Sequence, residues 1–230
     1  MKFLKMLSVV LVLALAQPAF AGRLQVSPTS FSVPQSAQTA SKELWISNTS
    51  DTPLSAQIRV MSWSQSDFSD QWSPTTDVLP SPAIVNVAPH TQQLVRIIVP
   101  KPLGATEKTF RVIVDELPGA QQESSTAQIN FLLRYSIPFF VNPDWSAPNL
   151  HANVEQIKGE WFVTVHNPTA HTIKATNLYT ESNGKQTMLI SGLVGYVLPN
   201  AQMRWPIPGP VSGDLKVTFN DQTQSSPLGH

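Results

Sequence analysis

The chain has 230 residues, contains no cysteine, and carries 15 basic and 15 acidic side chains. This length suffices for one large or two ordinary domains with hydrophobic cores. The absence of cysteine excludes disulfides, thiolate catalysis and cysteine-ligated metals. No basic stripe accompanies the aromatic residues, so nucleic acid is not an expected partner.

The first 21 residues predict a cleavable signal peptide. Two lysines precede an apolar run over residues 6–16, and the small-x-small sequence A-F-A ends at Ala21. The apolar run is shorter than the ~20 residues that a membrane-spanning helix needs. We therefore expect residues 1–21 to be removed and the mature chain to begin at Gly22, outside the cytosol.

Residues 22–143 predict an immunoglobulin-like β-sandwich. Seven short alternating or β-branched runs are separated by polar segments rich in proline, and no window keeps the three-and-four spacing of a helix. Seven strands in this length fit an immunoglobulin-like fold. The runs are LQVSPTSFSVP, SKELWISNTS, LSAQIRVMSW, PAIVNVAP, QQLVRIIVP, KTFRVIVDELP and AQINFLLRYSIPFF.

Residues 149–230 predict a second, smaller β-sandwich domain. About six further short runs follow the segment F-V-N-P-D-W-S-A-P-N, whose prolines make a short and stiff connection. Asn183 and Gly184 stand between two of these runs and predict a hairpin turn, because both residue types tolerate positive φ. The chain is therefore expected to be all-β, with two domains.

No pattern in the chain predicts catalysis, and we expect no enzyme activity, no cofactor and no metal. The histidines lack metal-ligand spacing, and the chain has neither a nucleophile elbow nor a glycine-rich phosphate loop. Asp115 and Glu116 are adjacent, so in a strand they point to opposite faces and cannot act as a pair. Asn48 begins a glycosylation triplet, N-T-S, a short pattern that often arises by chance.

The run A-Q-I-N-F-L-L-R-Y-S-I-P-F-F is apolar on both faces of the predicted strand. Ile129, Phe131 and Leu133 fall on one face, and Leu132 and Arg134 fall on the other. One interpretation is an ordinary sandwich strand that packs in its own core. The other is a strand with an outward apolar row, which an ordinary edge strand avoids.

Three segments in this order give the chain a family resemblance. L-V-R-I-I-V, T-F-R-V-I-V-D-E-L-P-G and I-N-F-L-L-R-Y-S-I-P-F-F-V-N-P, behind a leader peptide, resemble the periplasmic chaperones of the chaperone–usher pathway. The form F-L-L-R-Y-S-I-P and the W-S-Q segment after Met61 are most similar to the archaic branch. The resemblance implies two immunoglobulin-like domains set at an angle, a periplasmic location, and pilus subunits and an outer-membrane usher as partners.

The resemblance also implies a role for the strand that is apolar on both faces. Family members donate the last strand of the first domain to an incomplete pilus subunit, a mode called donor-strand complementation. The donated residues would be Ile129, Phe131 and Leu133, while Leu132 and Tyr135 would serve the chaperone's own core. Self-association of the free protein to cover the donated residues is left open.

The resemblance further implies a basic anchor for the terminal carboxylate of the subunit. The sequence departs from the usual pair, because the first strand has no basic residue after Arg23 and the later position is occupied by residues 136–138. We expect Arg111 and Arg134 as substitutes, since guanidinium groups suit bidentate carboxylate binding. The alternative for each arginine is a surface ion pair. Asn142 also stands where a charge is common in the family.

A second class of function is an exported structural or carbohydrate-binding β-sandwich adhesion protein. Trp63 and Trp72, together with Asp67 and Asp70, would form the exposed loop of such a binding module. A pilus subunit is a further alternative, although it would usually consist of one domain. A stable complex with a pilus subunit would favour the chaperone.

Overall fold

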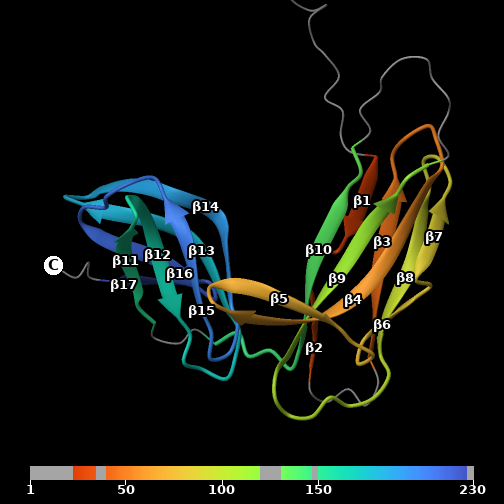
Figure 1. Cartoon of the computed structure of the whole chain (residues 1–230), viewed down its shortest axis with the longest axis horizontal. Coiled ribbons are helices and arrows are strands. Elements are labelled where there is room, and N and C mark those ends of the chain that lie inside the picture. Colours follow the sequence, from red (N-terminus) through yellow and green to blue (C-terminus); the bar gives the residue numbers. More distant parts are fainter. Residues whose placement is uncertain (1–22, 35–39, 120–130, 147–149, 227–230) are drawn as a thin grey trace, which may run out of the picture.

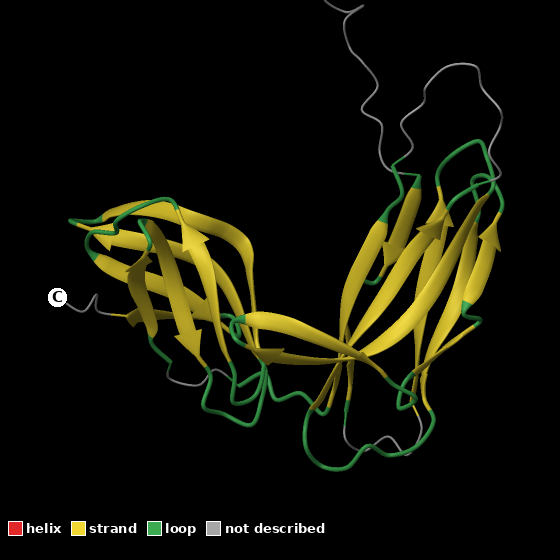
Figure 2. Cartoon of the chain, viewed as in Figure 1, coloured by secondary structure: helices red, strands yellow, loops and turns green. Residues whose placement is uncertain are grey.

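The computed structural model describes residues 23–34, 40–119, 131–146 and 150–226, and all regular structure in these ranges is β-strand (Figure 2). The predicted signal peptide and the start at Gly22 lie outside the described residues. In the described part of the chain, no helix is long and apolar enough to cross a membrane. The strands are β1 (Leu24–Ser27), β2 (Phe31–Val33), β3 (Ala40–Asn48), β4 (Leu54–Ser66), β5 (Ser69–Pro74), β6 (Leu79–Ser81), β7 (Ile84–Val87), β8 (Gln92–Val99), β9 (Lys108–Leu117), β10 (Arg134–Val141), β11 (Ala152–Ile157), β12 (Glu160–His166), β13 (Ile173–Ser182), β14 (Lys185–Val197), β15 (Gln202–Ile207), β16 (Asp214–Phe219) and β17 (Gln222–Ser226).

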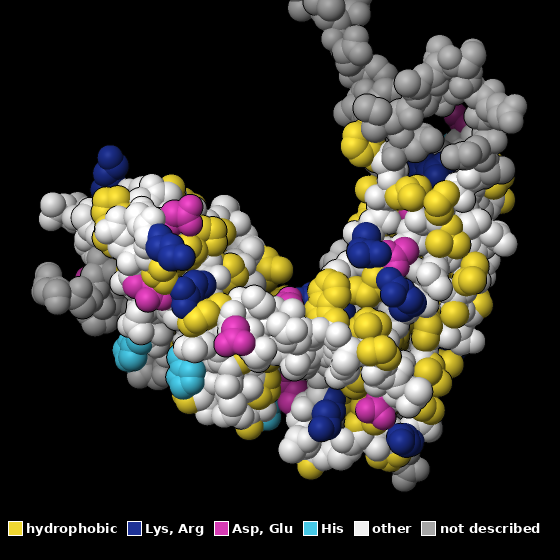
Figure 3. All heavy atoms as spheres, in the orientation of Figure 1, with side chains coloured by type: hydrophobic (Ala, Val, Ile, Leu, Met, Phe, Trp, Pro, Cys, Tyr) yellow, Lys and Arg dark blue, Asp and Glu magenta, His cyan; other side chains and the backbone are white. Residues whose placement is uncertain are grey.

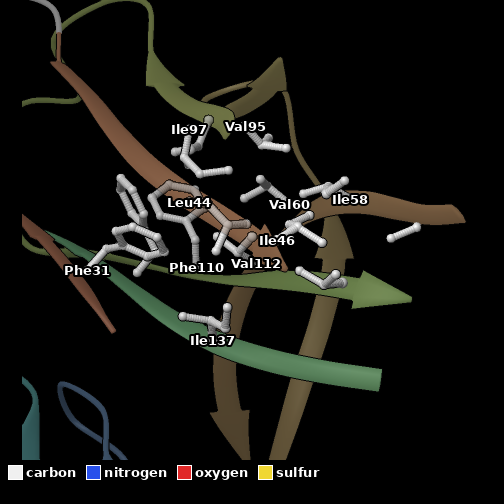
Figure 4. Packing of buried hydrophobic residues seen from close by; sticks show 14 of the residues in the cluster. Phe31, Leu44, Ile46, Ile58, Val60, Val95, Ile97, Phe110, Val112 and Ile137 are labelled. Atoms are coloured by element: carbon white, nitrogen blue, oxygen red, sulfur yellow. The ribbon is translucent and has the colours of Figure 1, made fainter. Parts of the chain in front are cut away.

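Strands β1 to β10 form a sandwich of two sheets (Figure 1). One sheet has the order β1-β3-β8-β6, and the other has the order β2-β10-β9-β4-β5, with β7 also pairing with β4. Apolar side chains of the two sheets point toward one another, as the alternation predicts (Figure 4). The core includes Phe31, Leu44, Ile46, Ile58, Val60, Val95, Ile97, Phe110, Val112 and Ile137.

Strands β11 to β17 form a second sandwich with its own core. Its sheets have the orders β11-β12-β15 and β14-β13-β16-β17. The predicted hairpin turn is confirmed, since Asn183 and Gly184 join β13 to β14 with φ of 50° and 76°. The expected all-β chain of two sandwich domains is therefore confirmed, whereas the angle between the domains and the limits 22–143 and 149–230 stay predictions.

The same buried asparagine motif organises a loop in each domain. Asn48 follows Ser47 at the end of β3 and its side-chain amide donates to the carbonyls of Thr52, Val87 and Ala88. Asn167, just after β12, is fully buried and donates in the same way to three carbonyls of its own domain. Asn48 is only 1% exposed, so its side chain is not accessible for glycosylation.

Candidate functional site

Strand β10 has an open edge along its first half. It pairs with β9 along its whole length, whereas β2 covers only Phe139–Val141 on the other side. Glu116 N–H donates to the Leu133 carbonyl, and Asn142 N–H donates to the Val33 carbonyl. Because backbone groups alternate along a strand, the odd-numbered residues bond to β9 and the even-numbered ones face the open side.

The open edge therefore presents unpaired backbone groups. The N–H and C=O groups of Leu132, Arg134 and Ser136 point away from β9, and no other described strand pairs with this stretch. Pro138 has no N–H to offer, so the donors end where β2 begins to pair with β10. Such an edge is a template for one further strand.

The side chains of β10 divide between the core and the outer face of the sheet. Ile137, Phe139 and Val141 lie in the core of the first domain, and Leu133 and Tyr135 pack against this core. Phe131, beyond the end of the strand, is 84% exposed, and Leu132 is 47% exposed.

The expected assignment of faces is partly wrong. Tyr135 contacts the core of the first domain, as predicted, but Leu133 does so as well. Leu132 is exposed instead of buried. The physical reason is that Leu133 and Tyr135 share one face, and the sandwich extends far enough to cover both. Phe131 is exposed as expected, and Ile129 lies outside the described residues.

Glu116 holds the point at which β10 begins. Its side chain is fully buried, forms an ion pair with Arg23, and accepts a hydrogen bond from the Leu133 N–H at 3.2 Å. Asp115, its neighbour, faces the outer side of the sheet, so the two carboxylates point to opposite faces as predicted. Glu116 therefore fixes Leu133, the residue just before β10, against β9.

Arg134 belongs to a charged cluster on the outer face. Asp115 accepts hydrogen bonds from Arg134 and, at 2.7 Å, from Arg59. Partial burial raises the pKa of Asp115, but the hydrogen bonds and charges of the two arginines outweigh burial and hold this pKa below its usual range. Arg134 is thus an exposed arginine in an ion pair, with 61% of its side chain accessible.

Arg111 lies in a different environment, at the junction of the two domains. Its guanidinium carbon stands 3.7 Å from the centre of the Trp63 ring, and its side chain is only 13% exposed. A terminal nitrogen lies 3.5 Å from an Asp70 carboxylate oxygen, and Nε is buried without a hydrogen-bond partner. Burial lowers the pKa of Arg111, although the Asp70 charge opposes this shift.

The structure places Arg111 and Arg134 on one face of the sheet but not side by side. Arg111 is paired with Pro138 across the strands and Arg134 with Asp115, so four positions separate them along the sheet. At about 3.4 Å per residue, this is roughly 14 Å along the strand direction. Each guanidinium group engages a different carboxylate.

The domain junction is built from aromatic residues of both domains. Trp63 of β4 and Phe140 of β10 are buried in the core of the second domain. Tyr196 of β14 contacts both rings, with centroid distances of 5.9 Å and 5.4 Å. Trp145 packs edge-on against Phe140. The strand that carries the open edge is therefore fixed at its other end by the second domain.

Two polar side chains of the first domain reinforce the junction. The Gln65 side chain donates to the Tyr196 carbonyl and accepts from the Leu198 N–H at 2.8 Å. The buried Glu107 carboxylate accepts two hydrogen bonds from Thr172, from the backbone N–H and the hydroxyl. Burial raises the pKa of Glu107 against the effect of these hydrogen bonds.

A cleft of about 320 Å³ lies beside this junction, where β2 begins. Its walls combine hydroxyl groups, aromatic rings and one lysine. It is lined by Ser30, Phe31, Ser32, Phe140, Trp145, Lys174, Tyr196, Asn220 and Asp221.

The predicted carbohydrate-binding loop is not formed. Trp63 is only 3% exposed and lies under Arg111, and Asp70 pairs with that arginine. Only Trp72 of the two tryptophans is accessible, at 45%. Among the described residues, no group of His, Asp and Glu side chains is arranged to hold a metal ion.

The comparisons with known proteins agree with this geometry. The family of pili and flagellar-assembly chaperones, PapD N-terminal domain, matches residues 23–146, which is more than half of the chain. The chain belongs to this chaperone family. The family consists of chaperones and not of enzymes, and the resemblance inferred from the sequence is confirmed.

Solved structures of similar proteins share the fold. The chaperone–tip adhesion subunit complex CsuC–CsuE from the archaic Csu pili of Acinetobacter baumannii matches with a TM-score of 0.66 and 22% identity, over 89% of this chain and 96% of that one. The Pseudomonas aeruginosa chaperone CupB2 matches with a TM-score of 0.58 and 22% identity, over 89% of this chain and 100% of that one. The Salmonella enterica SafA pilin–SafB chaperone complex matches with a TM-score of 0.57 and 18% identity, over 92% and 96%. Comparison with curated sequences finds no match.

Gln65 and Tyr196 were missed by sequence reasoning, and Trp63 and Asp70 were considered only for a carbohydrate-binding loop. Trp63, Gln65 and Asp70 lie on the β4–β5 hairpin, and Tyr196 lies in the second domain. Their importance depends on how the hairpin meets the second domain, which a strand pattern does not encode. The signal that was available is the unusual density of tryptophan, glutamine and aspartate in the run W-S-Q-S-D-F-S-D-Q-W.

Proposed function

We propose that this chaperone binds pilus subunits in the periplasm by adding the open edge of β10 to an incomplete subunit fold. The observation that carries the proposal is the open edge of the first half of β10, on the side away from β9, beside which Phe131 is 84% exposed. Residues 1–21 would direct export and then be removed. Residues 22–143 would form the domain that donates the strand, and residues 149–230 the smaller domain that supports it.

The edge supplies two kinds of contact at once. The free backbone groups of Leu132, Arg134 and Ser136 would pair with a subunit strand, while Phe131, together with Ile129, would fill the apolar groove. Burying one such side chain contributes ~1.5–3 kcal/mol before ordering costs. Leu133 packs partly against the home core, so its contribution would be smaller. No catalytic step or cofactor is involved.

Arg111 is the better candidate for the carboxylate anchor. Its guanidinium carbon lies over the Trp63 ring near the end of the open edge, and its Nε has no partner. A carboxylate at the end of a paired subunit strand would receive charge-assisted hydrogen bonds there. Arg134, already bound to Asp115, would instead contact the subunit along its strand.

The partners follow from this proposed mechanism. One similar structure pairs a chaperone with a tip adhesion subunit, and another pairs a chaperone with a pilin. We infer that pilus subunits are the clients of this chain and that an outer-membrane usher receives the complex.

The test is co-expression of the tagged chaperone with pilus subunits secreted by the same organism. We expect a stable one-to-one complex after purification. The matched control is the same subunit with its missing strand supplied by a fused peptide, which should no longer bind. Equal binding of the completed subunit would contradict strand donation.

A further inference from the structure

The ion pair between Arg111 and Asp70 is longer than the ion pair between Arg59 and Asp115 on the same sheet face. The Arg111 terminal nitrogen is 3.5 Å from Asp70 Oδ2, whereas Arg59 is 2.7 Å from Asp115. Direct charge-assisted hydrogen bonds are usually about 2.7–2.9 Å long. Asp70 is 31% exposed and Arg111 is 13% exposed, so water reaches the acid more easily than the base.

Asp70 is held in place by a group other than Arg111. Its Oδ1 accepts a hydrogen bond from the Gln65 side-chain amide at 2.9 Å. The same amide donates to the Tyr196 carbonyl at 3.0 Å, and the Gln65 oxygen accepts from Leu198. Asp70 is therefore tied to the domain junction, and its distance from Arg111 follows from that attachment.

Arg111 is also fixed, and its donors are only partly used. The guanidinium carbon lies 3.7 Å from the centre of the Trp63 ring, and the buried Nε has no hydrogen-bond partner. Asp70 contacts one terminal nitrogen, although a guanidinium group can bind a carboxylate through two parallel hydrogen bonds. A better-placed carboxylate would thus gain contacts that Asp70 does not make.

We propose that Asp70 is an intramolecular competitor that occupies Arg111 in the free chaperone and is displaced by the terminal carboxylate of the client. This inference rests on the proposed function, since it assigns Arg111 to that carboxylate. Asp70 partly neutralises a buried cation while no client is bound. Asp70 also weakens the binding of free carboxylates to Arg111, because a carboxylate that is not delivered by a paired strand must compete with this fixed internal acid.

The test compares two peptides of the last strand of the co-purifying pilus subunit, one with a free terminal carboxylate and one with a terminal carboxamide. Wild-type chaperone should prefer the carboxylate peptide. Asp70→Asn should raise affinity for the carboxylate peptide about two- to fivefold, which corresponds to the loss of a weak exposed ion pair. Affinity for the carboxamide peptide should not change.

Two matched variants isolate the competition. Asp115→Asn removes the same charge from the same sheet face, and it should leave the ratio of the two affinities unchanged. In an Arg111→Ala background, Asp70→Asn should give no gain for the carboxylate peptide. Thermal unfolding checks that each variant is folded, and Asp70→Ser serves as a second substitution that also removes the charge.

The outcomes separate this inference from the proposed function. If Arg111→Ala abolishes the preference for the carboxylate but Asp70→Asn leaves it unchanged or weakens it, the competitor role of Asp70 is overturned and the anchor stands. If Arg111→Ala keeps the full preference, both the anchor and the competitor role are overturned. Strand donation itself is tested separately by the completed subunit.

Discussion

The two halves of the donated segment differ in pairing and in exposure. Residues 137–141 are buried, pair with β9, and from Phe139 onward also pair with β2. Residues 134–136 pair with β9 alone among the described strands, and Leu133, just before them, is hydrogen-bonded to Glu116 of β9. Phe131 and Leu132 are exposed. The difference shows that the two ends of one segment have different roles. Its second half holds the molecule together, and its first half is free to bind.

The largest expected effect comes from exchanging phenylalanines of the two halves for alanine. Phe139 is fully buried and packs against Phe31 and Phe110, so Phe139→Ala should lower the free energy of unfolding by about 3–5 kcal/mol. Phe131→Ala should change it by less than about 0.5 kcal/mol, because an exposed side chain leaves no cavity. Denaturant unfolding of both variants checks this contrast. Equal destabilisation would show that Phe131 belongs to the home core.

The next effect concerns client binding. Phe131→Asp should leave the melting temperature unchanged but weaken the complex with a pilus subunit about 10- to 100-fold. A carboxylate in an apolar groove must either be neutralised or break the contact, and the lost burial of Phe131 alone is worth ~1.5–3 kcal/mol. Copurification yield and titration measure the loss. A variant that binds as tightly as wild type would mean that Phe131 does not enter the client.

Two single proline substitutions, at adjacent positions, test which backbone N–H groups face the open edge and which face β9. The Ser136 N–H faces the open edge, so Ser136→Pro should keep the fold and cost the client complex one hydrogen bond, about 0.5–1.5 kcal/mol. The Tyr135 N–H faces β9, so Tyr135→Pro should break the sheet and lower the melting temperature. The opposite order of stabilities would contradict the assignment of the open edge.

The smallest effect is the pH dependence of the Asp115 cluster. Because the pKa of Asp115 is below its usual value near 3.8 in the folded state, its ion pairs add stability above that value. This contribution is lost as the pH falls through the lower, folded-state pKa. The difference in melting temperature between wild type and Asp115→Asn should therefore be constant from about pH 7 to 5 and shrink below about pH 4. A difference that persists unchanged at the lowest pH would exclude the ionised carboxylate as its source.

Much of the fold could be predicted from the sequence because strand alternation is a local signal. Most of the strands, the absence of helix in the described ranges, and the hairpin at Asn183 and Gly184 follow from residue type and spacing. Strands β5 and β6 lie outside the predicted runs. The exposed Phe131 was also expected. Alternation assigns side chains to two faces but does not say where the core ends. The prediction therefore placed Leu132 in the core and Leu133 outside it, whereas the structure shows the reverse.

The rest of the site depends on contacts between the domains. Phe140 looks like a core residue of its own domain, yet it packs with Trp63 in the core of the second domain. Arg111 was predicted as an anchor, but its stacking on Trp63 and its pairing with Asp70 require the folded hairpin. Such contacts join residues far apart in the chain, so no local pattern reveals them.

The central claim, that the first half of β10 receives a client strand, is tested most directly by hydrogen exchange of its individual amides. In the free chaperone, the Arg134 and Ser136 amides should exchange quickly and those of Tyr135 and Ile137 slowly. In a purified complex with a pilus subunit, the Arg134 and Ser136 amides should become as protected as their neighbours. Fast exchange at Arg134 and Ser136 in a fully formed complex would contradict strand donation by β10.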